Sequence, residues 1–345
     1  MRISKAGRDL RRAILLAVAV TACSVGAARA DGGAKSEHVT VSGLVENDVF
    51  FDTDRDYTNG LMLSVTLGPD STPAWLDDAA CRLPIFEAPE GDCTGRKLRR
   101  TIEFGQNMYT PTDITLPNPP LTDRPYAGFL YLGLGFVTDD DEEQQQLQLQ
   151  LGVVGPASLA DRTQTWFHGL IGAHRPQGWH TQLKNEPALV LTYERSWRSW
   201  QSTEIFGLSL DLSPHLGGAV GNVYDYVNGG AMVRFGLDLP KDFGPPRIDP
   251  SLPGSSFPDL DTPFSAYVFA GVDGRAIGRN LFLDGNSFVA SRHVAKNPLV
   301  GDFEFGWVVV YQRLQVAFTH VFRTKEYHTQ PGVDQFGSVT VSYTF

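Results

Sequence analysis

The chain has 345 residues, of which 42% are hydrophobic and 20% charged, and its formal net charge is −10 at pH 7. This acidic balance argues against nucleic-acid binding, because that function needs a basic face. No run of 18 or more apolar residues follows the first thirty residues, which excludes ordinary membrane-spanning helices. Transmembrane β-strands remain possible, since each of them alternates apolar with polar residues.

Residues 1–30 have the features of a cleaved Sec signal peptide. Five basic residues precede the short apolar run 13–20, and Ala28-Arg29-Ala30 provides small residues at the spacing that signal peptidase reads. The rival is a lipoprotein cleavage site that would leave Cys23 lipidated. Loss of six basic residues and one acidic residue with the peptide would leave the mature chain at −15.

The rest of the chain is dominated by two-residue alternation, which is typical of β-strands with one apolar face. In 146–153, for example, Leu147, Leu149 and Leu151 alternate with glutamines. Twelve stretches are expected as strands: 38–46, 59–68, 99–109, 126–138, 145–155, 186–197, 202–212, 228–239, 264–275, 301–311, 313–323 and 336–345.

These strands predict an all-β fold, a twelve-stranded antiparallel transmembrane β-barrel that occupies residues 31–345 as a single domain in the bacterial outer membrane. A closed barrel leaves no unpaired backbone groups in lipid. The alternative is a soluble β-sandwich. Long strands, aromatic residues near strand ends and a C-terminal Phe345 favour the barrel, and a terminal aromatic residue of this kind is typical of the signal read by the barrel-assembly machinery.

Connection lengths predict the orientation, because outer-membrane barrels have short periplasmic turns and longer outer loops. The connections at 139–144 and 198–201 are short and belong to the periplasmic side if the N-terminus lies there. The longer, outer connections are expected at 47–58, 110–125, 156–185, 213–227, 276–300 and 324–335.

Two long connections fall on the periplasmic side and break this pattern. Segments 69–98 and 240–263 are rich in Pro and Gly, and we expect them to be irregular periplasmic insertions. The first contains Cys81 and Cys93, which predict a disulfide in an exported chain.

The first outer connection carries an unusual concentration of acidic residues. Residues 46–56 contain five carboxylates, and Asn47 and Thr58 lie beside them. Carboxylate, amide and hydroxyl oxygens are ligands that Ca²⁺ favours. The same residue types are also good turn formers, so composition leaves both interpretations open. Elsewhere, His168 on spacing alone is a weak catalytic candidate, and none of the common nucleophile, zinc or phosphate-loop motifs occurs.

Several motifs in the first half of the chain closely resemble those of the lipid A 3′-O-deacylases, a family of outer-membrane enzymes. They are Asn47-Asp48, Asp54-Arg55-Asp56-Tyr57-Thr58-Asn59-Gly60, Gly105-Gln106-Asn107-Met108-Tyr109-Thr110-Pro111, Asp123-Arg124-Pro125-Tyr126-Ala127-Gly128 and Gly178-Trp179 with Gln182-Leu183-Lys184-Asn185-Glu186-Pro187. The resemblance extends from about residue 38 to the C-terminus and is specific only up to about residue 200.

The resemblance implies a twelve-stranded barrel that hydrolyses the ester of the 3′-acyloxyacyl chain of lipid A with the help of Ca²⁺. It implies His168 as general base, Asn47 and Asp48 as a pair needed for activity, with Asp48 as metal ligand, and Thr58 as an active-site hydroxyl. These roles agree with the chemistry of imidazole and of bound metal ions.

The chain departs from some family members where lipid phosphates would bind. Residues 112–121 contain no Lys or Arg, whereas a basic pair occurs there in some members. Arg124, Arg175 and Lys184 are possible substitutes. The implied partners are lipid A in the outer leaflet, the outer membrane itself and the barrel-assembly machinery. The alternative functions are a phospholipase-like acyl hydrolase and a non-enzymatic small pore or structural barrel.

Overall fold

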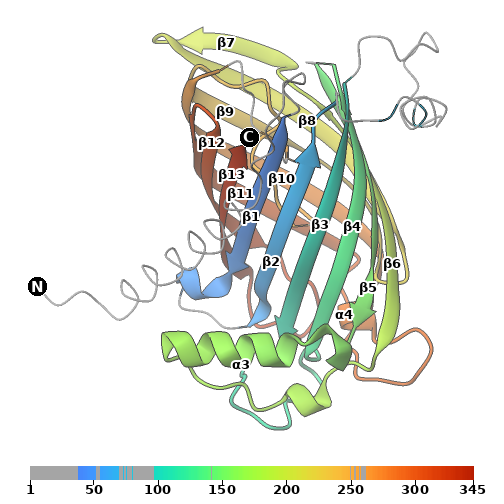
Figure 1. Cartoon of the computed structure of the whole chain (residues 1–345). Helices are drawn as coiled ribbons and strands as arrows, with labels where there is room; N and C mark the ends of the chain where they lie inside the picture. The colour runs from blue at the N-terminus through green and yellow to red at the C-terminus, as the bar shows by residue number, and fades with distance from the viewer. Residues whose placement is uncertain are drawn as a thin grey trace, which may run out of the picture.

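The computed structural model is an antiparallel β-barrel whose first and last strands lie side by side (Figure 1). It describes residues 38–51, 55–69, 73, 75, 80, 97–140, 142–248, 250–251, 254–255, 257 and 262–345. The signal-peptide prediction, Cys81 and Cys93 lie outside these residues. No helix in the described part is long and apolar enough to cross a membrane.

Thirteen strands are assigned among the described residues, and twelve of them form the closed wall. The strands are β1 Val39–Asn47, β2 Asp56–Leu67, β3 Lys97–Thr110, β4 Ala127–Asp139, β5 Glu143–Val154, β6 Glu186–Trp197, β7 Gln201–Ile205, β8 Leu208–Gly221, β9 Tyr224–Leu237, β10 Phe264–Asn280, β11 Leu299–Tyr311, β12 Leu314–Arg323 and β13 Asp334–Thr344. The helices are η1 Asp48–Phe51, η3 Pro156–Ser158, α3 Ala160–Ile171, η4 Trp179–Thr181 and α4 Leu281–Asp284.

Closure is made at two places. β1 pairs with β13 over most of its length, and β6 pairs with β8 rather than with β7. The twelve-stranded antiparallel barrel predicted from the alternation is therefore confirmed. Every backbone group within the wall can pair with a neighbouring strand, as a lipid environment requires.

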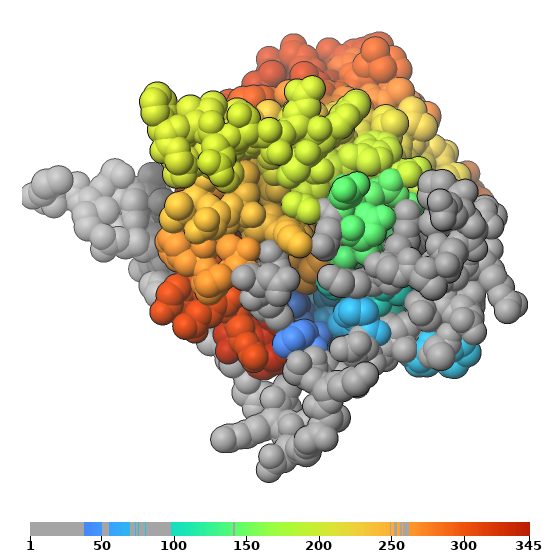
Figure 2. Space-filling view, turned by 90° about the horizontal axis from the view of Figure 1, so that it is seen from above, coloured from blue at the N-terminus to red at the C-terminus, as the bar shows by residue number. Residues whose placement is uncertain are grey.

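The seventh strand of the wall differs from the prediction. The stretch 202–212 is two strands, β7 and the start of β8, joined by a tight turn at Phe206 and Gly207. Both turn residues have positive φ, 54° and 76°, as two-residue hairpins require. This hairpin extends the barrel at the end where β1 begins, and Figure 2 shows its yellow-green atoms gathered at one side of that end.

The predicted outer loop 213–227 is also wrong, because most of these residues belong to strands. β8 continues to Gly221, β9 begins at Tyr224, and only Asn222 and Val223 connect them. The stretch 214–221 contains a proline and several small residues, so it shows little alternation. Pairing with β6 and β9 fixes it as a strand, which is a tertiary effect that local patterning does not reveal.

Side chains alternate across the wall. On β5 the inward-facing Gln148 donates to Glu103 Oε2 at 2.8 Å, while Leu149 and Leu151 face outward. Along the seam, Ser42 and Ser342 exchange a hydrogen bond of 2.7 Å inside the barrel. The outer face thus presents apolar side chains to lipid, and the inner face satisfies its polar groups internally.

The described part of segment 240–263 folds back into the lumen. Arg247 donates to Glu46 Oε1 at 2.8 Å and also pairs with Glu304, so it joins residues of β1 and β11. Asp242 accepts from Arg234 of β9 at 2.7 Å. The described residues of this segment therefore pack against the inner wall.

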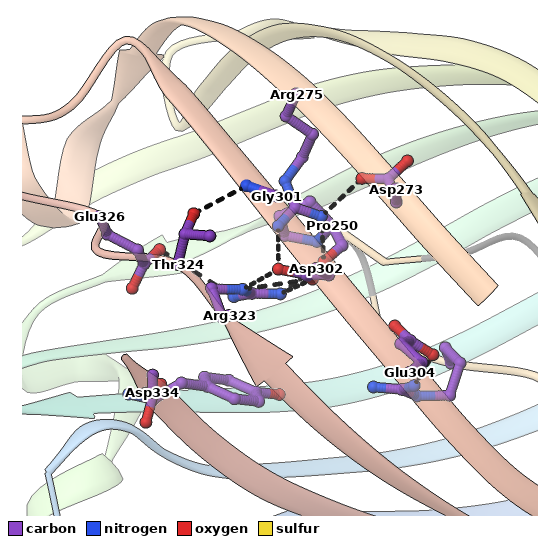
Figure 3. Close-up of polar contacts among 12 residues, drawn as sticks. Pro250, Asp273, Arg275, Gly301, Asp302, Glu304, Arg323, Thr324, Glu326 and Asp334 are labelled. Atoms are coloured by element: carbon purple, nitrogen blue, oxygen red, sulfur yellow. Dashed lines mark hydrogen bonds and ion pairs between the residues drawn. The ribbon is translucent and has the colours of Figure 1, made fainter. Parts of the chain in front are cut away.

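Further ion pairs continue through the lumen (Figure 3). Asp302 lies between Arg275 and Arg323, with a shortest distance of 2.8 Å to each. All three are nearly inaccessible to solvent. Paired charges of this kind and the inserted segment fill the interior, which is the arrangement of a plugged barrel and not of an open pore.

Candidate active site at the outer end of the barrel

The end at which β1 finishes and β2 begins also carries α3 and α4, and it is called the outer end below (Figure 1). Asn47 is the last residue of β1 and Asp48 the first of η1, and both are buried. Asn47 Oδ1 accepts from Val49 N at 2.7 Å, and Asp48 Oδ2 accepts from Arg55 N at 2.6 Å. Backbone donors therefore fix the directions of both side chains.

Thr58 of β2 lies beside Asn47 and Asp48. Asn47 is opposite Asn59 in the β1–β2 ladder, and a bulge between Tyr57 and Asn59 displaces Thr58 from the pairing with β3. Bulges redirect a side chain in this manner and are frequent beside active sites. Thr58 is 2% exposed, and its hydroxyl bonds the Thr110 hydroxyl at 2.6 Å. Asn47, Asp48 and Thr58 are thus neighbours.

Helix α3, which carries His168, is docked on β3 and β4. Gln106 of β3 donates to the Ser158 carbonyl at 2.6 Å immediately before the helix. Gly128 of β4 faces Ser158 and Ala160 so closely that a Cβ at Gly128 would approach within 3.0 Å of each. Only glycine permits this approach between strand and helix.

His168 is 4% exposed, one turn after the buried Gln164 on the same helix face. Gln164 accepts from Trp179 Nε1 at 2.7 Å, which ties the helix to the following connection. His168 Nδ1 bonds the carbonyl oxygen of His174. Because a carbonyl only accepts, neutral His168 carries its proton on Nδ1, and the lone pair of Nε2 is the basic position.

The fold therefore brings all four predicted site residues to one end of the barrel. Asn47, Asp48 and Thr58 are joined by strand register, whereas His168 comes from the long connection between β5 and β6. All four side chains are buried. Thr110, Gln164 and Trp179 were not singled out from the sequence as individual residues. Thr110 and Trp179 lie within motifs that carry the family resemblance, whereas nothing in the sequence marked Gln164.

The three predicted phosphate-binding cations differ in position. Arg124 is fully buried, donates to Glu326 Oε2 at 3.0 Å and lies 4.8 Å from the Tyr109 ring centroid. It is a structural cation here, and a lipid phosphate does not reach it. Arg175 and Lys184 are exposed on the connection after α3.

The role of Asp48 as a calcium ligand stays a prediction. Asp48, Asn47 and Thr58 offer hard oxygen donors of the kinds Ca²⁺ takes. In the part of the chain that the structure describes, no group of three or more His, Cys, Asp or Glu residues could hold a metal ion. Asp52 and Asp54 lie outside that part. The donor types fit the ion, and the number of carboxylates among the described residues is below what Ca²⁺ usually takes.

The closed wall, the filled lumen and the polar cluster at one end define an outer-membrane barrel with a site at its rim. A family model described as outer membrane protein LpxR matches residues 14–345. The chain therefore belongs to the LpxR family, which confirms the resemblance to the lipid A 3′-O-deacylases and the outer-membrane location.

One solved structure agrees with the fold. LpxR from Salmonella typhimurium is 20% identical and has a TM-score of 0.69, with 89% of this chain and all of that chain covered. The β-domain of the Bordetella autotransporter BrkA is 8% identical with a TM-score of 0.41, covering 90% of this chain and 98% of that chain. A search of curated proteins gave no match.

Proposed function

We propose that this chain is an outer-membrane esterase that removes the 3′-linked acyloxyacyl chain of lipid A. The observation that carries the proposal is the meeting of the family's motif residues Asn47, Asp48 and Thr58 at the barrel end that also carries His168. The outer end is where a substrate in the outer leaflet would reach the protein. The filled lumen supports a rim enzyme over the pore alternative.

The proposed reaction is a direct attack of water. His168 Nε2 takes a proton from water as the water oxygen attacks the ester carbonyl carbon. The tetrahedral intermediate then collapses, and the bond between the carbonyl carbon and the 3′ oxygen of the sugar breaks. The 3′ oxygen receives the proton from His168. The products are the free acyloxyacyl carboxylic acid and the 3′-hydroxyl of the sugar. The His174 carbonyl acts as the orienting partner of the base.

Negative charge develops on the carbonyl oxygen and must be stabilised. Since Asn47 Oδ1 accepts from Val49 N, Nδ2 is the end of this side chain that would donate to the oxyanion. Calcium, when bound by Asp48 with the neighbouring amide and hydroxyl oxygens, would supply further positive charge at this position. Arg175 and Lys184 would bind the lipid phosphates as exposed cations near the site. The terminal Phe345 would serve the barrel-assembly machinery.

Mass spectrometry of lipid A from cells expressing the chain tests the function. The wild type should lose the mass of the 3′-acyloxyacyl group in the presence of Ca²⁺, and a His168→Ala variant should not. Unchanged lipid A from a folded, surface-exposed barrel would contradict the proposal. Release of fatty acid from phospholipid under the same conditions would point instead to the phospholipase-like alternative.

The water mechanism has its own test. If no acyl-enzyme forms, added hydroxylamine should not capture the acyl group during turnover. Formation of the acyl hydroxamate at a rate that competes with hydrolysis would require a covalent intermediate and would exclude His168 acting only on water.

A further inference from the structure

A shallow groove crosses the outer wall of the barrel on β8–β11, away from the β1–β2 site. Its floor is a row of outward-facing glycines that are direct partners in the sheet. Gly229 of β9 is opposite Gly274 of β10, and Gly274 is opposite Gly301 of β11. Three neighbouring strands therefore lack side chains at the same height. Leu216 of β8 is the next partner in this row and lies over Gly229, where a Cβ would meet its Cδ2 at 2.7 Å, so the bare backbone floor is at Gly274 and Gly301.

Apolar ridges border this row on both sides. Towards the outer end, Val227, Ala276 and Leu299 form the next row of partners. Towards the other end, the corresponding row is Ala231, Val272 and Phe303. The groove has a volume of about 860 Å³. Val227 and Leu299 are 65% and 71% exposed, so the ridges stand out from the wall and face the lipid.

The outer mouth of the groove is polar. Asn297, Thr324 and Lys325 line it, and Asn297 Nδ2 donates to the Lys325 carbonyl at 2.6 Å. Thr324 extends the floor row by exchanging two hydrogen bonds with the backbone of Gly301, one of which is drawn in Figure 3. The nearby Lys296 is paired with Asp284, but Lys325 is exposed and makes no ion pair with any described residue.

We propose that this groove binds a lipid A molecule of the outer leaflet, separate from the one being hydrolysed. One acyl chain lies over the glycine row between the apolar ridges, and a phosphate meets Lys325 at the mouth. The groove is apolar along the wall and cationic at its outer end. Lipid A has the same order, with acyl chains inside the leaflet and phosphates at the membrane surface. A second copy of the barrel fits less well, because its convex wall cannot reach a floor recessed between two ridges.

Native mass spectrometry of the detergent-purified protein with diphosphorylated lipid A tests the proposal by counting bound lipids. All variants carry His168→Ala, so that lipid is not consumed. Gly274→Phe fills the groove, and the barrel tolerates it because a Cβ there meets only the Gly229 carbonyl, at 3.8 Å. Ala270→Phe is the matched control, since it adds the same ring to the lipid-facing side of the same strand outside the groove lining.

The expected result is that Gly274→Phe binds one lipid A fewer than Ala270→Phe, with at least a tenfold weaker affinity for that lipid. Lys325→Gln should weaken binding of diphosphorylated lipid A severalfold and leave binding of its dephosphorylated form unchanged. Gly301→Leu gives the same test should Gly274→Phe not fold. Equal lipid counts in Gly274→Phe and Ala270→Phe would overturn the proposal. A dimer that only Gly274→Phe abolishes would also overturn it and assign the groove to a second copy.

The number of lipid A molecules bound in the groove does not depend on catalytic activity. If the chain did not hydrolyse lipid A at all, the groove would still bind one lipid A in Ala270→Phe and none in Gly274→Phe. A failure of the groove and a failure of the proposed function are therefore distinguishable.

Discussion

Adding one methyl group at Gly128 should reduce activity without unfolding the barrel. In Gly128→Ala the new Cβ would lie within 3.0 Å of Ala160 Cβ and Ser158 Oγ, whereas ordinary contacts are 3.4–4 Å. The start of α3 must then move away from β4 by about 1 Å. A displacement of about 1 Å at a catalytic group can cost roughly 100-fold in rate, and His168 moves with the helix.

The assay is lipid A deacylation by purified protein, with the fold checked by heat-modifiable mobility on gels. Gly274→Ala is the control, because its Cβ meets a single atom at 3.8 Å on the lipid-facing wall. We expect Gly128→Ala to lose about two orders of magnitude in kcat while Gly274→Ala retains wild-type activity. Activity of Gly128→Ala within twofold of wild type, with a folded barrel, would refute the argument that docking of α3 positions the base.

Three further predictions concern the groups around the site. Gln164→Leu leaves Trp179 Nε1 without its acceptor and should destabilise α3 locally by about 1–3 kcal/mol. Amide hydrogen exchange in 160–171 should then be faster, and unchanged exchange would show that this hydrogen bond does not stabilise the helix. Thr110→Val removes the hydroxyl partner of Thr58 and should lower kcat more than it raises KM, and the reverse pattern would assign Thr58 to substrate binding. Arg124→Met removes the nearer of the two cations of the buried Glu326, leaving Arg323 at 4.0 Å, and should cost about 3–5 kcal/mol of stability. Exposed Lys184→Met should leave stability unchanged and weaken lipid A binding; equal stability of the two variants would contradict the structural role of Arg124.

The difference between Arg124 and Lys184 shows where sequence reasoning reached its limit. Both are cations in connections that were expected on the outer side, and both sit in motifs of the family. Which of them is buried depends on Glu326 and Tyr109, residues about 200 and 15 positions away in the chain. Charge and local context do not contain that information, because ion pairs in a barrel join segments that are distant in sequence.

Segment 240–263 gives a second example. Its composition predicted an irregular connection but contained no information about its position. The described residues pack inside the barrel because Arg247 and Asp242 find buried partners on β1, β9 and β11. An inner wall of unpaired carboxylates and guanidinium groups would be costly, and the inserted segment supplies their partners.

The sequence by itself determined the fold class, the number of wall strands and the family, because the two-residue alternation and the motifs before residue 200 are local properties of the chain. The tertiary structure decided the boundary between β7 and β8, the filling of the lumen, the separate roles of the cations and the glycine-floored groove. Each of these depends on strand register and closure. Register places Gly229, Gly274 and Gly301 in one row, although 72 positions separate the first from the last along the chain.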